Sequence, residues 1–224
     1  MKALAIDAAA SCMVVAAKNG DNTVTLSLDL GMRQSEKILP AIQYVLEQAN
    51  VAADELDYMA VTKGPGTFTG LRLAFSALKA LELAHGAPIY GISSLEAYAL
   101  PYAAFPCKIV SVIDAKKDQF FAAVYQHGTE LFAPQDASVA DVLSVLKDHE
   151  AVITVGPDAA SFAQALNKAN AALAVTCCTS QPPATQALFM LVEEAIAKKM
   201  PPLQDYEGPA YLRKSEAELS LEKR

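Results

Sequence analysis

Two five-residue stretches decide the fold, Leu4-Ala5-Ile6-Asp7-Ala8 and Ser111-Val112-Ile113-Asp114-Ala115. In each stretch an apolar run typical of a buried strand ends at an aspartate. Because a five-residue match also arises by chance, its weight depends on the elements that follow each copy. The match indicates where the two halves of a duplicated chain would begin.

The same order of elements follows both stretches. In the first half, strand patterns cover residues 3–6, 12–17, 23–30, 58–62 and 88–92. Helical patterns cover residues 35–50, 69–85 and 94–99, with Ser35 and Ser94 as predicted N-caps. In the second half, strands are predicted over 109–113, 120–125, 129–132, 152–155 and 173–176, and helices over 138–149, 161–170 and 185–199. Each half is therefore predicted as βββαβαβα.

A three-stranded meander followed by alternating helices and strands predicts an α/β lobe with a mixed sheet, the ribonuclease-H-like topology. Two such lobes would face each other across a cleft. We place the N-terminal, pairing lobe at residues 1–102 and the C-terminal lobe at residues 103–224, ending in a charged, mobile tail.

The composition describes a globular chain and narrows the function classes. Of 224 residues, 53% are hydrophobic and 19% are charged, and the net charge of −7 argues against binding a polyphosphate backbone unaided. No stretch is long and uncharged enough to span a bilayer. Asp7 interrupts the N-terminal apolar run too early for a signal peptide. The four cysteines are then expected to be reduced thiols of a cytoplasmic protein.

The most specific motif is Lys63-Gly64-Pro65-Gly66-Thr67-Phe68-Thr69-Gly70-Leu71-Arg72, between a predicted strand and a predicted helix. It is neither a dinucleotide fingerprint nor a P-loop. Its glycines permit unusual backbone angles and close packing, and either threonine could cap the helix. Alternatively, its backbone N–H groups could hold an anion at the helix N-terminus.

The helix over residues 69–85 is apolar on more than one face. Its leucines, Phe75 and four alanines leave only a thin polar side, whereas an ordinary surface helix has a narrower apolar stripe. Either the helix lies wholly inside its lobe, or one face packs against a partner.

Four segments together resemble the bacterial TsaB (YeaZ) family of tRNA threonylcarbamoyladenosine biosynthesis proteins, within the actin-like ATPase and sugar kinase superfamily (ASKHA fold). The glycine motif resembles that family's G-P-G-S/T-F-T-G-x-R, and Ser35-Glu36 with Leu39-Pro40 resembles H-S-E-x-L-x-P, with Gln34 in place of the histidine. Ile113-Asp114-Ala115-Lys116 resembles I-D-A-R, and Pro209-Ala210-Tyr211-Leu212-Arg213 resembles P-x-Y-L-R. The landmarks keep the family order along nearly the whole chain.

The resemblance implies a non-catalytic subunit of the complex that transfers threonylcarbamoyl to N6 of the adenosine next to the anticodon. Its partners would be a TsaD-like catalytic subunit and a TsaE-like ATPase, with homodimers when alone and tRNA bound only through the complex. ATP or ADP and a metal ion are expected in the partner subunits. Nucleotide-facing residues at the partner interface would be Asp7, Gly64, Pro65, Gly66, Thr67, Thr69, Gly70 and Arg72. Partner-interface residues would be Leu71, Phe75, Leu78, Leu81, Glu36 and Leu39.

The alternative is a stand-alone ATP-dependent kinase or a glycoprotease-like peptidase of the same superfamily. Such kinases hold phosphates with a glycine after the strand-end aspartate, but alanine or lysine follows Asp7 and Asp114 here. Asp7 could then orient a cation or simply cap a turn. Because the three histidines are not paired at i, i+4, the sequence predicts no catalytic residues and no metal site.

Overall fold

The computed structural model describes residues 1–29, 31–117, 119–148 and 150–213. The first half forms β1 (Lys2–Asp7), β2 (Cys12–Asn19), β3 (Asn22–Asp29), α1 (Gln34–Gln48), β4 (Tyr58–Gly64), α2 (Phe68–His85), β5 (Ile89–Ser93) and α3 (Ser94–Ala99). The second half forms β6 (Lys108–Lys116), β7 (Gln119–Gln126), β8 (Thr129–Ala137), α4 (Val139–Leu143), β9 (Ala151–Val155), α5 (Ala159–Ala169), β10 (Ala174–Cys177) and α6 (Ala184–Ala197). Short 3-10 turns lie at Gly31–Arg33, Ala53–Glu55 and Leu100–Tyr102. The predicted duplication is confirmed, and the predicted tail lies outside the described residues.

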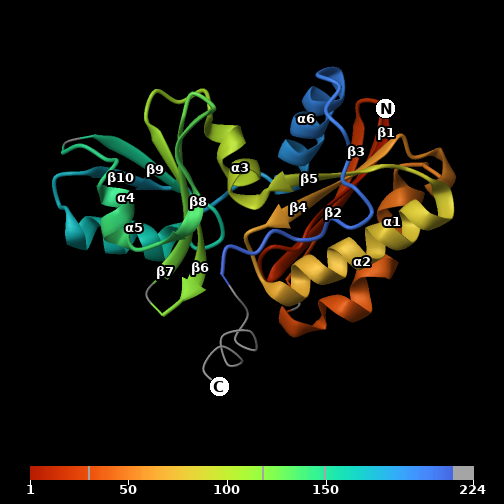
Figure 1. Cartoon of the computed structure of the whole chain (residues 1–224), viewed down its shortest axis with the longest axis horizontal. Coiled ribbons are helices and arrows are strands. Elements are labelled where there is room, and N and C mark those ends of the chain that lie inside the picture. Colours follow the sequence, from red (N-terminus) through yellow and green to blue (C-terminus); the bar gives the residue numbers. More distant parts are fainter. Residues whose placement is uncertain (30, 118, 149, 214–224) are drawn as a thin grey trace.

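The two sheets have equivalent topologies (Figure 1). The first sheet has the order β3-β2-β1-β4-β5 and the second the order β8-β7-β6-β9-β10. In both, the first three strands form an antiparallel meander, the fourth strand pairs in parallel with the first, and the fifth pairs in parallel with the fourth. β1 and β6 are thus equivalent, which places Asp7 and Asp114 at corresponding strand ends.

Side-chain alternation along β1 explains the layers of the first lobe. Leu4 and Ile6 face one core with α1 and α2, whereas Ala3 and Ala5 face a second core with α6. The small alanines let α6 approach the sheet closely. On the second sheet, α4 and α5 cover one face, and α3 packs on β6 and β7 at the other.

The element order assigns α6 to the second half, but its contacts place it on the first sheet, against β1, β2, β4 and β5. Residues from both halves also share one apolar cluster. Leu71 and Leu95 of the first half pack there with Ile109, Ile113 and Val155 of the second. The lobes are therefore joined by a hydrophobic core. The boundary at residues 102 and 103 stays a prediction.

Three predicted local details were wrong. Ser35 does not cap α1, because a 3-10 turn leads directly into a helix that begins at Gln34. Ser94 is the buried first residue of α3, and Ser93 precedes it without a side-chain cap bond. The helix expected over 138–149 ends at Leu143, where the Ser144 hydroxyl donates to the Asp141 carbonyl oxygen (2.6 Å). Such back-bonding competes with helix continuation.

Candidate functional site: the junction of the glycine motif

The glycine motif connects the end of β4 to the start of α2. The Thr67 hydroxyl accepts a hydrogen bond from the Gly70 N–H (3.3 Å), so Thr67 is the N-cap. Gly86, with a left-handed φ of 83°, ends the same helix. Of the two capping threonines that the sequence allowed, the structure selects Thr67.

The motif packs directly on the β1–β2 turn, residues 8–11. The Thr67 N–H donates to the Ala9 carbonyl oxygen (2.8 Å). A Cβ atom on Gly66 would overlap the Ala9 backbone, and one on Gly70 would overlap the Ala8 carbonyl oxygen. These glycines are therefore required for contact between two segments of the chain itself.

Gly64 serves a similar contact on the other side of the motif. Its φ of 117° is a conformation that favours glycine, and a Cβ there would overlap the Ala210 carbonyl oxygen. The Ala210 N–H donates to the Lys63 carbonyl oxygen (2.6 Å), and the Gly64–Pro65 peptide is cis. The motif is thus enclosed between the β1–β2 turn and the C-terminal segment.

Asp7 is buried at the end of β1 and its carboxylate is fully engaged. Oδ1 accepts from the Ala9 N–H (3.1 Å) and the Thr62 hydroxyl (2.9 Å), and Oδ2 accepts from the Tyr98 hydroxyl (3.0 Å). Burial raises the pKa of Asp7 above its ordinary value, although these three hydrogen bonds oppose the shift. Asp7 joins β1, β4 and α3, so its contacts support the turn-capping interpretation.

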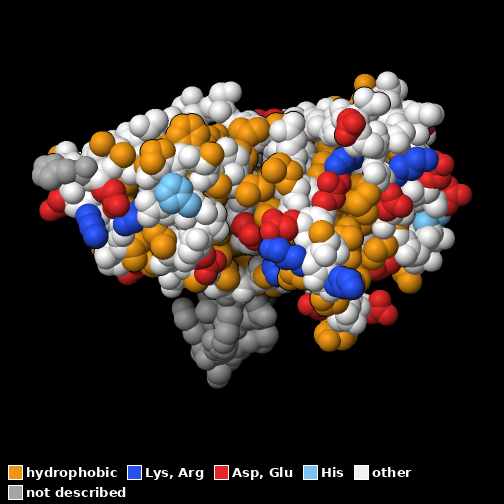
Figure 2. All heavy atoms as spheres, turned by 90° about the horizontal axis from the view of Figure 1, so that it is seen from above, with side chains coloured by type: hydrophobic (Ala, Val, Ile, Leu, Met, Phe, Trp, Pro, Cys, Tyr) orange, Lys and Arg blue, Asp and Glu red, His pale blue; other side chains and the backbone are white. Residues whose placement is uncertain are grey.

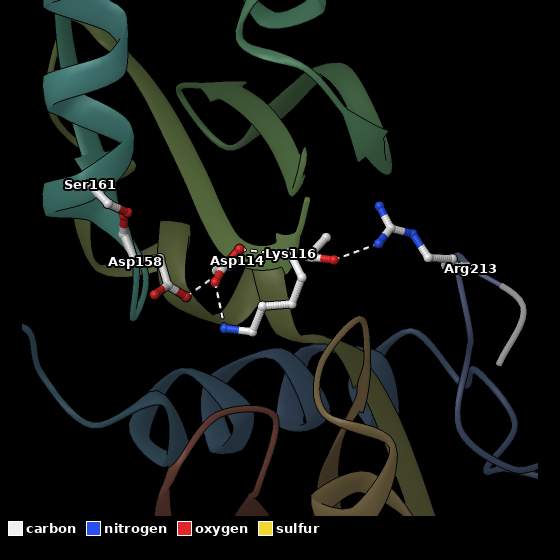
Figure 3. Close-up of polar contacts among 6 residues, drawn as sticks. Asp114, Lys116, Asp158, Ser161 and Arg213 are labelled. Atoms are coloured by element: carbon white, nitrogen blue, oxygen red, sulfur yellow. Dashed lines mark hydrogen bonds and ion pairs between the residues drawn. The ribbon is translucent and has the colours of Figure 1, made fainter. Parts of the chain in front are cut away.

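Asp114, the equivalent residue of the second lobe, is more open (Figure 3). Its carboxylate accepts from the Lys116 N–H (2.7 Å) and the Lys116 ammonium (2.6 Å), and its own N–H donates to the Asp158 carboxylate (2.7 Å). Burial opposes ionisation, but the Lys116 interactions outweigh it and lower the pKa of Asp114. Corresponding aspartates therefore have opposite pKa shifts.

Two cavities lie beside this junction. One, of about 250 Å³, is lined by the glycine motif, the β6–β7 hairpin and residues 210–213. Its walls include Phe68, Phe121 and Tyr211. The other, of about 440 Å³, reaches from Asp7 and Tyr98 to the residues around Gly156. Pro65, Gly66 and Thr67 of the predicted nucleotide-facing set line the first cavity, and Asp7 lines the second.

The carbonyl oxygens of the β1–β2 turn are bonded within the chain. Its Ala9 carbonyl is bonded to Thr67, and the Gln34 amide donates to the carbonyl oxygens of Ala10 (3.0 Å) and Ser11 (2.8 Å). Gln34 is buried, so this residue at the family's histidine position attaches the turn to α1. Sequence reasoning noted the substitution and missed its role, because residues 10 and 34 are far apart in the chain. Thr69 and Arg72 are exposed at the start of α2.

The predicted partner-interface residues divide into two groups. Leu71, Phe75 and Leu78 are buried in the chain's own cores, so the prediction that these three contact a partner is corrected. The sheet buries this face of α2, as a helix packed inside its lobe requires. Leu81 is half-buried, while Leu39 (61% exposed) and Glu36 lie on the surface of α1.

Leu83 is an interface candidate that the sequence analysis missed, and the residue is 88% exposed. It follows Arg72 by 11 residues, Ser76 by 7 and Lys79 by 4, which puts it on the same helical face as these polar residues. The spacing of Leu83 from these polar residues was the sequence signal that could have marked it as exposed. Tyr44 of α1 is also exposed (48%), and α1 and α2 lie on the same side of the first sheet (Figure 1). We call the exposed side of these two helices the α1–α2 surface.

The described residues hold no group of three or more His, Cys, Asp or Glu side chains that could bind a metal ion. None of the helices in that part of the chain is both long and apolar enough to cross a membrane. On the face shown in Figure 2, acidic and basic side chains are interspersed, with no continuous basic patch. That face offers no extended site for a polyphosphate backbone.

These features define a two-lobed actin-like protein whose glycine motif packs on the β1–β2 turn. The TsaD family, described as tRNA N6-adenosine threonylcarbamoyltransferase, matches residues 31–221. The chain belongs to this family, in its TsaB (YeaZ) branch.

Two named relatives and one solved structure are similar to this chain. The tRNA threonylcarbamoyladenosine biosynthesis protein TsaB of Bacillus subtilis is 28% identical over 97% of this chain and 96% of its own length. The protein of the same name from Escherichia coli is 31% identical over 56% of this chain and 55% of its own. YeaZ from Pseudomonas aeruginosa superposes with a TM-score of 0.76 at 22% identity, covering 94% of this chain and 99% of that one. The structural likeness concerns the fold alone.

Proposed function

We propose that this chain is the non-catalytic subunit of a complex that forms threonylcarbamoyladenosine in tRNA. The observation that carries the proposal is the glycine motif, whose Gly64, Gly66 and Gly70 approach Ala210, Ala9 and Ala8 so closely that their lack of a side chain serves packing within the chain. The family assignment supports the reaction, and the geometry supports a role without chemistry of its own. In this proposal, threonylcarbamoyl is transferred to N6 of the adenosine next to the anticodon by the partner enzyme.

The TsaD-type enzyme docks on the α1–α2 surface in this proposal. Leu39, Tyr44 and Leu83 expose apolar area there, and burying a leucine side chain contributes about 1.5–3 kcal/mol. The same surface would pair two copies of the chain when the enzyme is absent. Glu36, on the exposed side of α1, would lie at the edge of the contact.

A TsaE-type ATPase would be the third member, and the chain would act in the cytoplasm. The partners would hold ATP or ADP and the metal ion, and they would supply the basic surface that tRNA needs. The net charge of −7 supports this division, because binding to a polyphosphate depends on lysine and arginine. The predicted nucleotide-facing residues Gly66 and Thr67 remain candidates for contact with a nucleotide bound mainly by the enzyme.

The alternative, a stand-alone kinase or peptidase, has less support. Kinases of this superfamily hold phosphates with a glycine after the strand-end aspartate, whereas Ala8, Ala9 and Ala10 follow Asp7 here. Titration of the purified chain with ATP and magnesium in a calorimeter separates the two proposals. Micromolar binding without a partner would favour the kinase and count against the subunit.

Co-purification with a TsaD-family enzyme is the direct test. We expect the two chains to form a complex and the complete set of subunits to produce threonylcarbamoyladenosine in unmodified tRNA, measured by mass spectrometry of nucleosides. Mixtures lacking this chain should make far less product. Equal product with and without this chain would refute the proposal.

A further inference from the structure

Residues 200–213, here called the strap, leave α6 and cross the first lobe toward β6 (Figure 1). The Leu203 N–H donates to the Ile89 carbonyl oxygen (2.8 Å), and the Leu203 side chain packs against the core under α2. Further along, Ala210 bonds to Lys63, in the space that Gly64 leaves open. The strap is therefore attached along the edge of the first sheet.

Tyr211 of the strap contacts the first turns of α2. Its ring lies 4.7 Å from the Phe68 ring, centroid to centroid, and its hydroxyl accepts from the Arg72 guanidinium (2.9 Å). The same guanidinium lies 5.6 Å from the Phe68 ring centroid and 5.5 Å from that of Tyr211. Aromatic stacking and a cation–π contact thus join strap and helix.

Arg213, two residues later, contacts all three meander strands of the second lobe. Its guanidinium makes a bidentate pair with Asp136 of β8 (2.7 and 2.8 Å) and lies 5.9 Å from the Phe121 ring of β7. It also donates to the Ala115 carbonyl oxygen of β6 (Figure 3). The Arg213 and Asp136 side chains are each only 26% exposed, which shields the pair from solvent.

We propose that the strap couples α2 to the β6–β7 hairpin, with Tyr211 and Arg213 as positioning residues. The two contacts are two residues apart, so a shift of the first turns of α2 moves the hairpin as well. This inference rests on the proposed function in one respect: the partner enzyme docks on the α1–α2 surface. The apolar cluster around Leu71 and Ile113 joins the lobes independently, so the fold survives loss of the strap contacts.

Hydrogen exchange of the full chain, measured without any partner, tests whether the Arg213 contacts stabilise the β6–β7 hairpin. In Arg213→Ala, hairpin peptides covering residues 108–126 should exchange about tenfold faster, because charged hydrogen bonds are lost. Peptides from β1 and β4 should keep wild-type rates. The matched control is Tyr206→Ala, on the same strap, at a residue that is 88% exposed. The swapped pair Asp136→Arg with Arg213→Asp should restore part of the protection.

The second arm adds the TsaD-family enzyme. In wild type, docking should slow exchange in both α2 and the hairpin, whereas in Arg213→Ala the hairpin should gain clearly less protection than α2, because only the apolar cluster around Leu71 and Ile113 then joins the two elements. If docking leaves α2 of the wild type unprotected, the proposed docking surface is wrong. If Arg213→Ala exchanges like wild type when alone, or its hairpin gains full protection on docking, the strap does not couple the two elements.

Discussion

Leu78 and Leu83 lie on one helix, five residues apart, in opposite environments. Leu78 is fully buried between α2 and the first sheet, while 88% of Leu83 is exposed. Shortening each to alanine should therefore separate folding from partner binding. Leu78→Ala removes packing atoms from the core, whereas Leu83→Ala removes atoms that contact mainly water in the free chain.

The magnitudes follow from burial. Leu78→Ala should lower the free energy of unfolding by about 2–5 kcal/mol. In a chain of this length that is a fall of roughly 4–20 °C in Tm. Leu83→Ala should change stability by less than about 0.5 kcal/mol. If docking buries Leu83, its loss should weaken the complex by about 1.5–3 kcal/mol, roughly tenfold to more than a hundredfold in Kd.

Thermal unfolding monitored by circular dichroism measures the first quantity, and titration calorimetry with the TsaD-family enzyme measures the second. Met190→Ala, on α6 at the other face of the first sheet, serves as the control and should alter neither quantity appreciably, because Met190 is 63% exposed. A Leu83→Ala protein that binds the enzyme with wild-type affinity would refute the docking surface. A Leu78→Ala protein as stable as wild type would refute the assignment of that face to the core.

Three further predictions concern the junction. Because burial raises the pKa of Asp7, the stability that its protonated form contributes is complete below pH 3.8 and is lost as the pH rises through the raised pKa. Asp7→Asn should remove this pH dependence from urea unfolding midpoints measured from below pH 3.8 to above the raised pKa. Gly70→Ala should destabilise the fold by about 1–3 kcal/mol through overlap with Ala8, while Gly208→Ala, in open space, should have little effect in the same urea titration. Thr67→Ala should cost about 0.5–2 kcal/mol through loss of the α2 cap, and an unchanged thermal midpoint would show that the cap is dispensable.

Local pattern was sufficient for most of the fold. Alternation and helical spacing placed every strand and helix of both halves, since each signal depends on residues within one element. The helix over 138–149 was overextended, because the Ser144 hydroxyl bond that ends it is a side-chain contact that periodicity does not register. The predicted N-caps Ser35 and Ser94 were wrong because capping also depends on side-chain hydrogen bonds that periodicity does not register.

The candidate site was less accessible to sequence reasoning. The motif itself was found, but its glycines allowed both close packing and anion binding until their neighbours Ala8, Ala9 and Ala210 were known. The apolar helix was likewise ambiguous. Its buried leucines dominated the pattern, although Leu83, on its polar side, is the exposed one.

By itself, the sequence determined the duplicated βββαβαβα order, the equivalent aspartates and the absence of glycine after each, because these are properties of the chain read in order. Only the tertiary structure decided that α6 covers the first sheet and that α3 packs on the second. It alone also showed that the glycine motif lies between residues 8–10 and Ala210. The contacts of α6 and of the glycine motif join segments more than 50 residues apart, and the geometry of all these contacts depends on how both lobes pack.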